Sequence, residues 1–77
     1  MNITVIDGQG GGLGRQLIQA LKKARPEIRI TAVGTNSAAA AAMLKGGADA
    51  AATGENAVIV ACRRADVILG PIGIAIS

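Results

Sequence analysis

The 77-residue sequence contains no phenylalanine, tyrosine or tryptophan, and it contains no histidine. Without aromatic side chains there is no platform on which bases stack, which argues against binding of single-stranded nucleic acid by stacking. Without histidine, imidazole-based metal sites and Ser–His or Cys–His nucleophile pairs are excluded. The core must come from isoleucine, valine, leucine and alanine, which bury less area than aromatic residues. We therefore expect a thin core supported by a partner copy or by further sequence, and we predict neither catalytic residues nor metal ligands.

Cysteine and charge are also sparse. The single cysteine, Cys62, excludes an internal disulfide framework, and a reduced, cytoplasmic location fits it best. The net charge is +3 and the eight basic residues are scattered, so we expect no nucleic-acid partner. No charged segment with an apolar core opens the chain, and no apolar run reaches the roughly 18 residues of a membrane span. We expect no membrane association, and one domain over residues 1–77.

Glycine, by contrast, is abundant, and five of the eleven glycines fall within residues 8–14. A short apolar strand, residues 3–6, precedes this segment, and apolar residues recur at helical spacing from Leu13 onward. A strand, a glycine-rich turn and a helix form the first half of a βαβ unit, whose unpaired N–H groups favour anion binding. The spacing Gly-x-x-x-Gly-x-Gly fits positions 8, 12 and 14, whereas Gly-x-Gly-x-x-Gly fits nowhere.

Two interpretations of this glycine-rich loop compete. A tight turn needs glycine for close packing whatever it binds, but one or two glycines suffice, so we favour a ligand site. Asp7 lies beside it, where a carboxylate repels phosphate. Either Asp7 accepts hydrogen bonds from the N–H groups of the loop itself, which we favour, or it works with a metal or a sugar hydroxyl.

Further strands and helices follow the loop. We predict strands at residues 28–33, 49–52 and 66–69, and helices at residues 37–45 and 54–64, with Thr35, Asn36 and Ser37 as candidate N-caps. Such alternation predicts an α/β, Rossmann-like parallel sheet in the order 3-2-1-4, the N-terminal part of a doubly wound fold. The fourth strand is then an exposed apolar edge. We therefore predict a homodimer, or a second segment of the same protein, packed against residues 71–77.

The carboxyl ends of the predicted strands meet at one edge of the sheet, where ligands of such sheets bind. The cofactor-binding residues predicted at this edge are Gly8, Gln9, Gly10, Gly11, Gly12, Leu13, Gly14, Gly34, Thr35, Asn36, Gly70, Pro71 and Ile72.

Two stretches resemble the nucleotide-binding half of short-chain dehydrogenases and reductases. Gly8, Gly12 and Gly14 match the glycine motif of these enzymes, and residues 66–74 are similar to their fourth strand and the turn that follows. Their catalytic tyrosine has no counterpart here. No acidic residue follows the second strand, where members that prefer NAD hold the ribose hydroxyls. The resemblance implies NADP or NAD, with NADP slightly favoured because no carboxylate is present to repel its 2′-phosphate.

A closer resemblance covers the whole chain. Five segments carry it, namely residues 5–12, 34–36, 47–49, 53–57 and 70–74. They look like a small uncharacterised bacterial family, described only as a domain of unknown function. Members of that family continue well past the length of this chain, which implies that Ser77 is a truncation. The resemblance supports a Rossmann-like fold and supplies no activity.

Two functions from different classes follow from these patterns. The first is a nucleotide- or dinucleotide-binding domain without catalytic residues of its own. The second is a structural or regulatory module that keeps the Rossmann scaffold, binds no ligand and assembles as a dimer. Whether the protein is an enzyme is left open.

Overall fold

Strands and helices alternate along the chain in a computed structural model that describes residues 1–70 and 73–76. The elements are β1 (Asn2–Asp7), α1 (Gly12–Ala24), β2 (Arg29–Gly34), α2 (Ser37–Lys45), β3 (Ala50–Thr53), α3 (Glu55–Arg64), β4 (Val67–Gly70) and β5 (Gly73–Ile76). Every strand and helix predicted up to β4 is present, with its ends shifted by no more than one residue. None of the described helices has both the length and the apolar character needed to cross a bilayer.

The strands form one sheet in the order β3-β2-β1-β4-β5. β1 pairs in parallel with β2 on one side and with β4 on the other, and β2 pairs in parallel with β3. This arrangement confirms the predicted Rossmann-like order 3-2-1-4. The direction of winding reverses between β1 and β4, so the crevice at the carboxyl ends of these two strands is the expected ligand position.

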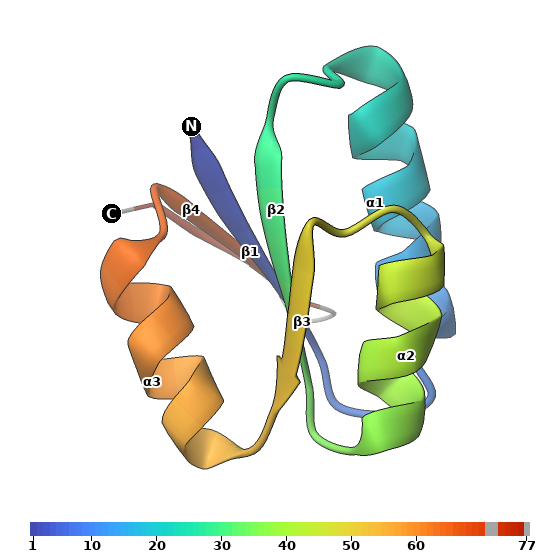
Figure 1. The fold of residues 1–77 in the computed structure, drawn as a ribbon. Coiled ribbons are helices and arrows are strands. Elements are labelled where there is room, and N and C mark those ends of the chain that lie inside the picture. Colours follow the sequence, from blue (N-terminus) through green and yellow to red (C-terminus); the bar gives the residue numbers. More distant parts are fainter. Residues whose placement is uncertain (71–72, 77) are drawn as a thin grey trace.

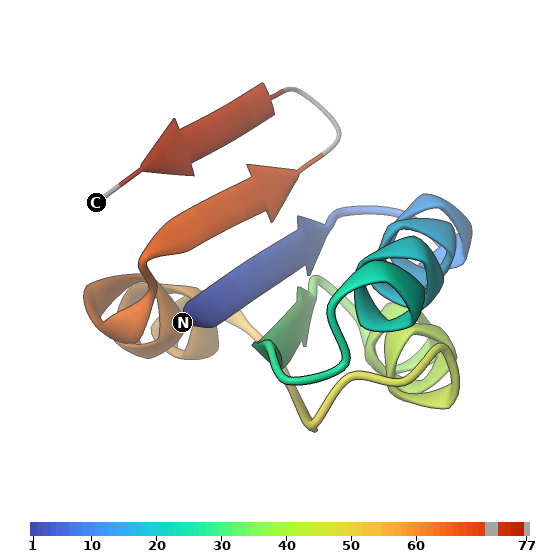
Figure 2. The ribbon, with the colours of Figure 1, turned by 90° about the horizontal axis from the view of Figure 1, so that it is seen from above.

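The prediction is wrong at the far edge of the sheet, where β5 adds a fifth strand antiparallel to β4 (Figure 2). Val67 pairs with Ile76, and Gly70 pairs with Gly73. A parallel partner needs a crossover of about a dozen or more residues, so the few residues after Gly70 allow only antiparallel pairing. The exposed edge is therefore β5 and not β4. Of the segment predicted to meet a partner, residues 71, 72 and 77 lie outside the described part of the chain.

The helices cover the two faces of the sheet unequally. α1 and α2 lie side by side on one face, and α3 lies alone on the other (Figure 1). The buried core lies between the sheet and the α1–α2 pair and consists of Ile3, Val5, Ile18, Ile30, Ala32, Met43 and Ala48. α3, by contrast, has no buried residue. Met43 belongs to this core and is fully buried, which the expectation of a core made of isoleucine, valine, leucine and alanine did not include.

An apolar surface remains beyond the reach of α1 and α2, over β4 and β5. Val67 and Leu69 pair with Ile3 and Val5 of the core strand β1, and both are only partly buried. In β5 the side chains of Ile74 and Ile76 are 72% and 80% exposed. No charged residue interrupts β5, so the outer edge of the sheet is apolar over its whole length.

Asp49 ties α1 to the start of β2. Its Oδ2 accepts hydrogen bonds from Lys22 Nζ at 2.7 Å and from the Ile30 N–H at 2.8 Å. Lys22 Nζ also donates to the Ile28 carbonyl oxygen at 2.6 Å. The hydrogen bond from Lys22 and then that from Ile30 hold the pKa of Asp49 below its ordinary value. The ionised carboxylate therefore favours the folded state.

We expect Asp49→Asn to lower the stability of the protein by roughly 1 kcal/mol at pH 7. A carboxyl group with a lowered folded-state pKa stabilises the fold above its unfolded-state pKa of about 3.9, and this stabilisation disappears as the pH falls through the folded-state pKa. The difference in unfolding free energy between the parent and Asp49→Asn should therefore shrink as the pH falls below about 3.9, as measured by urea unfolding at several pH values. Glu27→Gln is the control because the ion pair of Glu27 with Arg25 joins side chains that are 63% and 71% exposed. A difference in unfolding free energy that stayed constant down to pH 2 would contradict this role of Asp49.

Candidate functional site

The glycine-rich loop joins Asp7 at the end of β1 to Gly12 at the start of α1, and its glycines form two sets. Gly11 and Gly14 are buried. Gly11 has φ 84°, and a Cβ atom there would lie 2.6 Å from the carbonyl oxygen of Ala39 in α2. A Cβ atom at Gly14 would lie 2.6 Å from Met43 Sδ. Packing against α2 therefore requires glycine at position 11, whereas a side chain at position 14 would have to displace the buried Met43 side chain.

Gly8, Gly10 and Gly12 form the second set, and all three are exposed. A Cβ atom at Gly10 or Gly12 would meet nothing within 4 Å, and one at Gly8 would lie in ordinary contact, 3.8 Å from Thr35 Cγ2. None of the three has a positive φ. The fold therefore has room for side chains here, and neither backbone conformation nor packing requires glycine.

Asp7 holds the loop in place through hydrogen bonds. It is only 5% exposed, and its two carboxylate oxygens accept hydrogen bonds from the Gln9 N–H at 2.8 Å and the Gly14 N–H at 3.1 Å. The pKa of Asp7 is lowered by the N–H groups of Gln9, Gly14 and Gly11, with the largest effect from Gln9, although burial acts in the opposite direction. This confirms the first of the two interpretations of Asp7, in which it accepts hydrogen bonds from the loop.

The N–H groups of Gly10, Gly12 and Leu13, at or just before the start of α1, are not among those from which Asp7 accepts hydrogen bonds. Within the described part of the chain, none of them donates a hydrogen bond. We predicted that the N–H groups of Gly10 to Gly14 bind an anion. Some of these N–H groups face Asp7, and the others are available to a ligand. Three available donors at the start of a helix are a suitable arrangement for phosphate oxygens.

Two of the cavities next to the loop are lined by Asp7. The loop cavity has a volume of about 580 Å³ and is lined by Asp7, Gly8, Gln9, Gly10, Gly12 and Leu13. The crevice cavity has a volume of about 290 Å³, lies between β1, α1 and the end of β4, and is lined by Val5, Ile6, Asp7, Leu13, Gly14, Leu17 and Gly70. Both contain Asp7 and Leu13, so they meet at the reversal point of the sheet. Their volumes lie near or within the range of about 300–1,000 Å³ that is typical of small-molecule sites.

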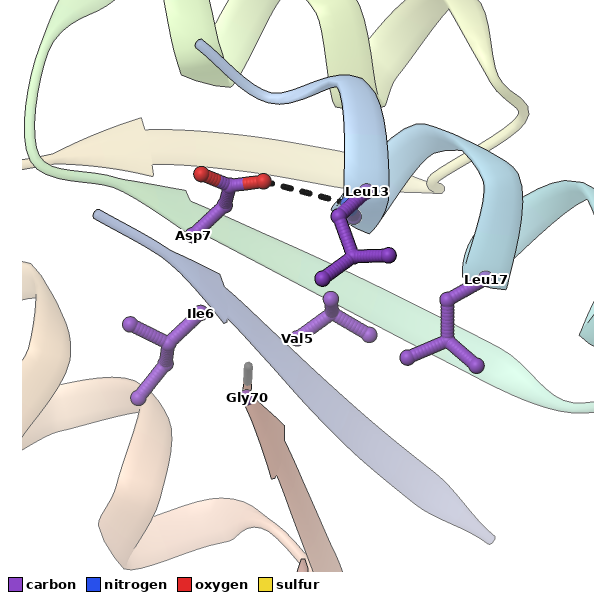
Figure 3. Close-up of a pocket in the computed structure, with 7 residues that line it drawn as sticks. Val5, Ile6, Asp7, Leu13, Leu17 and Gly70 are labelled. Carbon is purple, nitrogen blue, oxygen red and sulfur yellow. Dashed lines mark hydrogen bonds between the residues drawn. The ribbon is translucent and has the colours of Figure 1, made fainter. Parts of the chain in front are cut away.

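Figure 3 shows how the crevice cavity is formed. Leu13 and Leu17 point from α1 toward Val5 of β1 and Gly70 of β4, while the Asp7 carboxylate turns toward the start of α1. The walls are apolar, and Asp7 is the single charged residue among those lining the cavity. Sequence reasoning missed Leu17, Val5 and Ile6 as lining residues. The four-residue spacing of Leu13 and Leu17, which places both on one helix face, was the available signal.

The segment after β2 lies against the loop. Asn36 is the N-cap of α2: its Oδ1 accepts from the Ala39 N–H at 2.8 Å, and its Nδ2 donates to the Gln9 carbonyl oxygen at 3.0 Å. The Thr35 N–H donates to the Asp7 carbonyl oxygen at 3.2 Å. Both polar ends of the Asn36 amide therefore hold the loop in place, whereas the Thr35 side chain is exposed.

The predicted site residues from the three loops are thus brought together only in part. Gly34 and Asn36 adjoin the glycine-rich loop, and Gly70 adjoins the crevice cavity. Gly34 is held close to α2, because a Cβ atom there would lie 2.6 Å from the Ala40 nitrogen. Pro71 and Ile72 fall outside the described residues. Within the described part of the chain, no cluster of three histidine, cysteine or acidic residues is arranged to hold a metal.

One protein family matches residues 2–77 of this chain, and it is described as a domain of unknown function, DUF3842. The chain matches none of the curated proteins and none of the solved structures with which it was compared. The similarity to short-chain dehydrogenases and reductases stays a prediction from the sequence.

Proposed function

The chain belongs to the DUF3842 family, a domain of unknown function, and we propose that it binds a nucleotide or dinucleotide at its glycine-rich loop. One observation carries this proposal: Gly8, Gly10 and Gly12 line the loop cavity although the fold has room for side chains at all three. Because the fold does not require glycine at these positions, we explain its presence by a ligand whose atoms approach the backbone closely. The available N–H groups of Gly12 and Leu13 then face the phosphates.

The proposed cofactor is NADP or NAD, and the domain supplies no catalytic residues of its own. The residues after β2 are Thr35, Asn36 and Ser37, so no carboxylate follows the strand to repel a 2′-phosphate, which slightly favours NADP. The ligand extends from the loop toward residues 34–36 on one side or toward residues 70–73 on the other. We place this activity in the cytoplasm, on the basis of the single cysteine.

Thermal unfolding in the presence of NADP(H), NAD(H), FAD and ATP tests this proposal. A ligand present at 100 times its dissociation constant should stabilise the protein by about 2.7 kcal/mol. In so small a domain this corresponds to a rise of several degrees in the melting temperature. No stabilisation by any of these nucleotides at millimolar concentration would contradict the proposal.

A second candidate function, a structural or regulatory module that dimerises, is favoured by the uncharged outer strand β5. Its exposed Ile74 and Ile76 and its unpaired edge offer a surface to a second copy of the chain or to a further segment of the same protein. In this second candidate the domain binds no ligand, so it is an alternative to nucleotide binding.

We expect sedimentation of the protein at micromolar concentration to give a dimer, and Ile76→Lys to give a monomer. A lysine at position 76 places a charge on the apolar edge, and charged side chains on edge strands oppose edge-to-edge pairing. Leu44→Lys is a matched control because Leu44 is also exposed, at 50%, but lies on α2 away from β5. A parent protein that sedimented as a monomer without any other chain present would contradict the dimer.

A further inference from the structure

The loop cavity combines hydrogen-bond donors with a buried negative charge. The N–H groups of Gly10, Gly12 and Leu13 are available to acceptor atoms of a ligand. Asp7 is among the residues that line this cavity and the adjoining crevice cavity, and its buried carboxylate is bonded to the N–H groups of Gln9 and Gly14. A ligand that brings phosphate oxygens to these donors therefore brings its negative charge close to Asp7.

Among the residues that the structure describes, no cation is paired with Asp7. Backbone N–H groups and burial are what shift its pKa, and no charged side chain of the described residues contributes. The ion pairs among those residues, Lys22–Asp49 and Arg25–Glu27, do not include it. The carboxylate also offsets the positive end of the α1 dipole, because it accepts the Gly14 N–H. Each further negative charge on the ligand is therefore repelled without compensation, and the repulsion is stronger near a buried group than in water.

Building on the proposed nucleotide binding, we propose that Asp7 makes the loop selective for phosphodiester groups over phosphomonoesters. A diester phosphate, such as each phosphate of a dinucleotide pyrophosphate bridge, carries one negative charge. A terminal phosphomonoester has a second pKa of about 6 and carries a charge between about −1.5 and −2 at neutral pH. Both offer oxygens to the three N–H groups, and they differ in the charge presented to Asp7. The ligand class is thus one that presents a diester phosphate to the three N–H groups, as either phosphate of a dinucleotide bridge does.

Adenosine 5′-monophosphate and its methyl ester are the probes, because they differ by one methyl group and one ionisable oxygen. We expect calorimetry at pH 8 to show the methyl ester binding about tenfold more tightly than the monophosphate, which corresponds to about 1.4 kcal/mol. NAD should compete with the methyl ester for the same site. Equal or tighter binding of the monophosphate by the parent protein would overturn the selectivity.

Two variants separate the role of Asp7 from that of overall charge. Asp7→Asn removes the negative charge beneath the loop, and we expect it to reduce the preference for the methyl ester to less than about twofold. Asp66→Asn removes one negative charge at the opposite end of β1, where Asp66 accepts the Asn2 N–H, and it should leave the preference unchanged. A preference that Asp7→Asn leaves intact would assign the selectivity to another group and overturn the proposal.

A measurement on the parent protein keeps the test decisive if Asp7→Asn does not fold. Lowering the pH from 8 to 5 protonates the monophosphate at its pKa of about 6 but leaves the methyl ester unchanged. Asp7 stays ionised, because its pKa lies below the ordinary value for aspartate. The affinity for the monophosphate should rise about tenfold while that for the methyl ester stays constant. If the affinity for the monophosphate falls or stays constant, the selectivity is overturned but nucleotide binding is not. If neither probe binds and NAD does not bind, both the selectivity and the proposed function are overturned.

Discussion

Replacing Gly12 with valine should abolish nucleotide binding and leave the sheet intact. Gly12 is the first residue of α1, is exposed, and has nothing within 4 Å of the position that a Cβ atom would occupy. A branched side chain there projects into the loop cavity and covers N–H groups that a phosphate must approach. Because valine at this position meets no neighbour, its effect on folding should be small.

The measurement is the nucleotide-dependent melting temperature, with circular dichroism as the check that the sheet and helices persist. Gln9→Ala is the matched control, since the Gln9 side chain is exposed and its contacts to Asp7 and Asn36 run through backbone atoms. It should retain most of the binding. If Gly12→Val bound every nucleotide as well as the parent does, or if a ligand-bound structure placed the anion elsewhere, the loop would not be the site.

Gly11→Ala should have the opposite effect and destabilise the fold itself. At φ 84° an alanine is strained, and its Cβ atom would lie 2.6 Å from the Ala39 carbonyl oxygen and 2.8 Å from the Ala39 Cα atom. Both are backbone atoms of α2, so the contact is relieved only by moving the helix. The left-handed conformation and the overpacking together should cost about 2–5 kcal/mol.

Urea unfolding measures this loss, and Gly10→Ala is its control. Gly10 is the preceding residue, has no positive φ, and has open space where the Cβ atom would lie, so its replacement should change stability by less than about 0.5 kcal/mol. Since small domains have only a few kcal/mol of stability, Gly11→Ala is expected to be largely unfolded at 25 °C. Equal stabilities of the two variants would show that α2 does not hold the loop as closely as the structure indicates.

The sequence is sufficient to predict the order of the first four strands, because strands that alternate with helices pair in parallel through right-handed crossovers, and a doubly wound sheet returns to β1 to add its fourth strand. Even β3, whose sequence Ala-Ala-Ala-Thr is weak for a strand, was predicted from this topology. β5 was missed because Gly73–Ile76 is four residues long, and a short apolar segment has no periodicity of its own. Its place depends on pairing with β4, which is a tertiary contact.

The candidate site was predictable at the level of the loop and not at the level of individual glycines. All five glycines within residues 8–14 look alike in the sequence. What separates Gly11 and Gly14 from Gly10 and Gly12 is the approach of α2, and that approach is set by Ala39 and Met43 some thirty residues along the chain. For the same reason the sequence alone allows two roles for Asp7, and its distances to the loop N–H groups distinguish them.

The hydrogen bonds of Asp7 have a consequence for the kinetics of binding. They fix the loop to its own strand and helix over a separation of at most seven residues, so the loop holds its shape before any ligand arrives. Asn36 adds a contact from the neighbouring loop. A site that is ordered in advance loses little conformational entropy when it is filled, and association then requires no rearrangement of the backbone. Encounter and orientation, and not a slow loop closure, should therefore limit the rate at which a ligand enters this site.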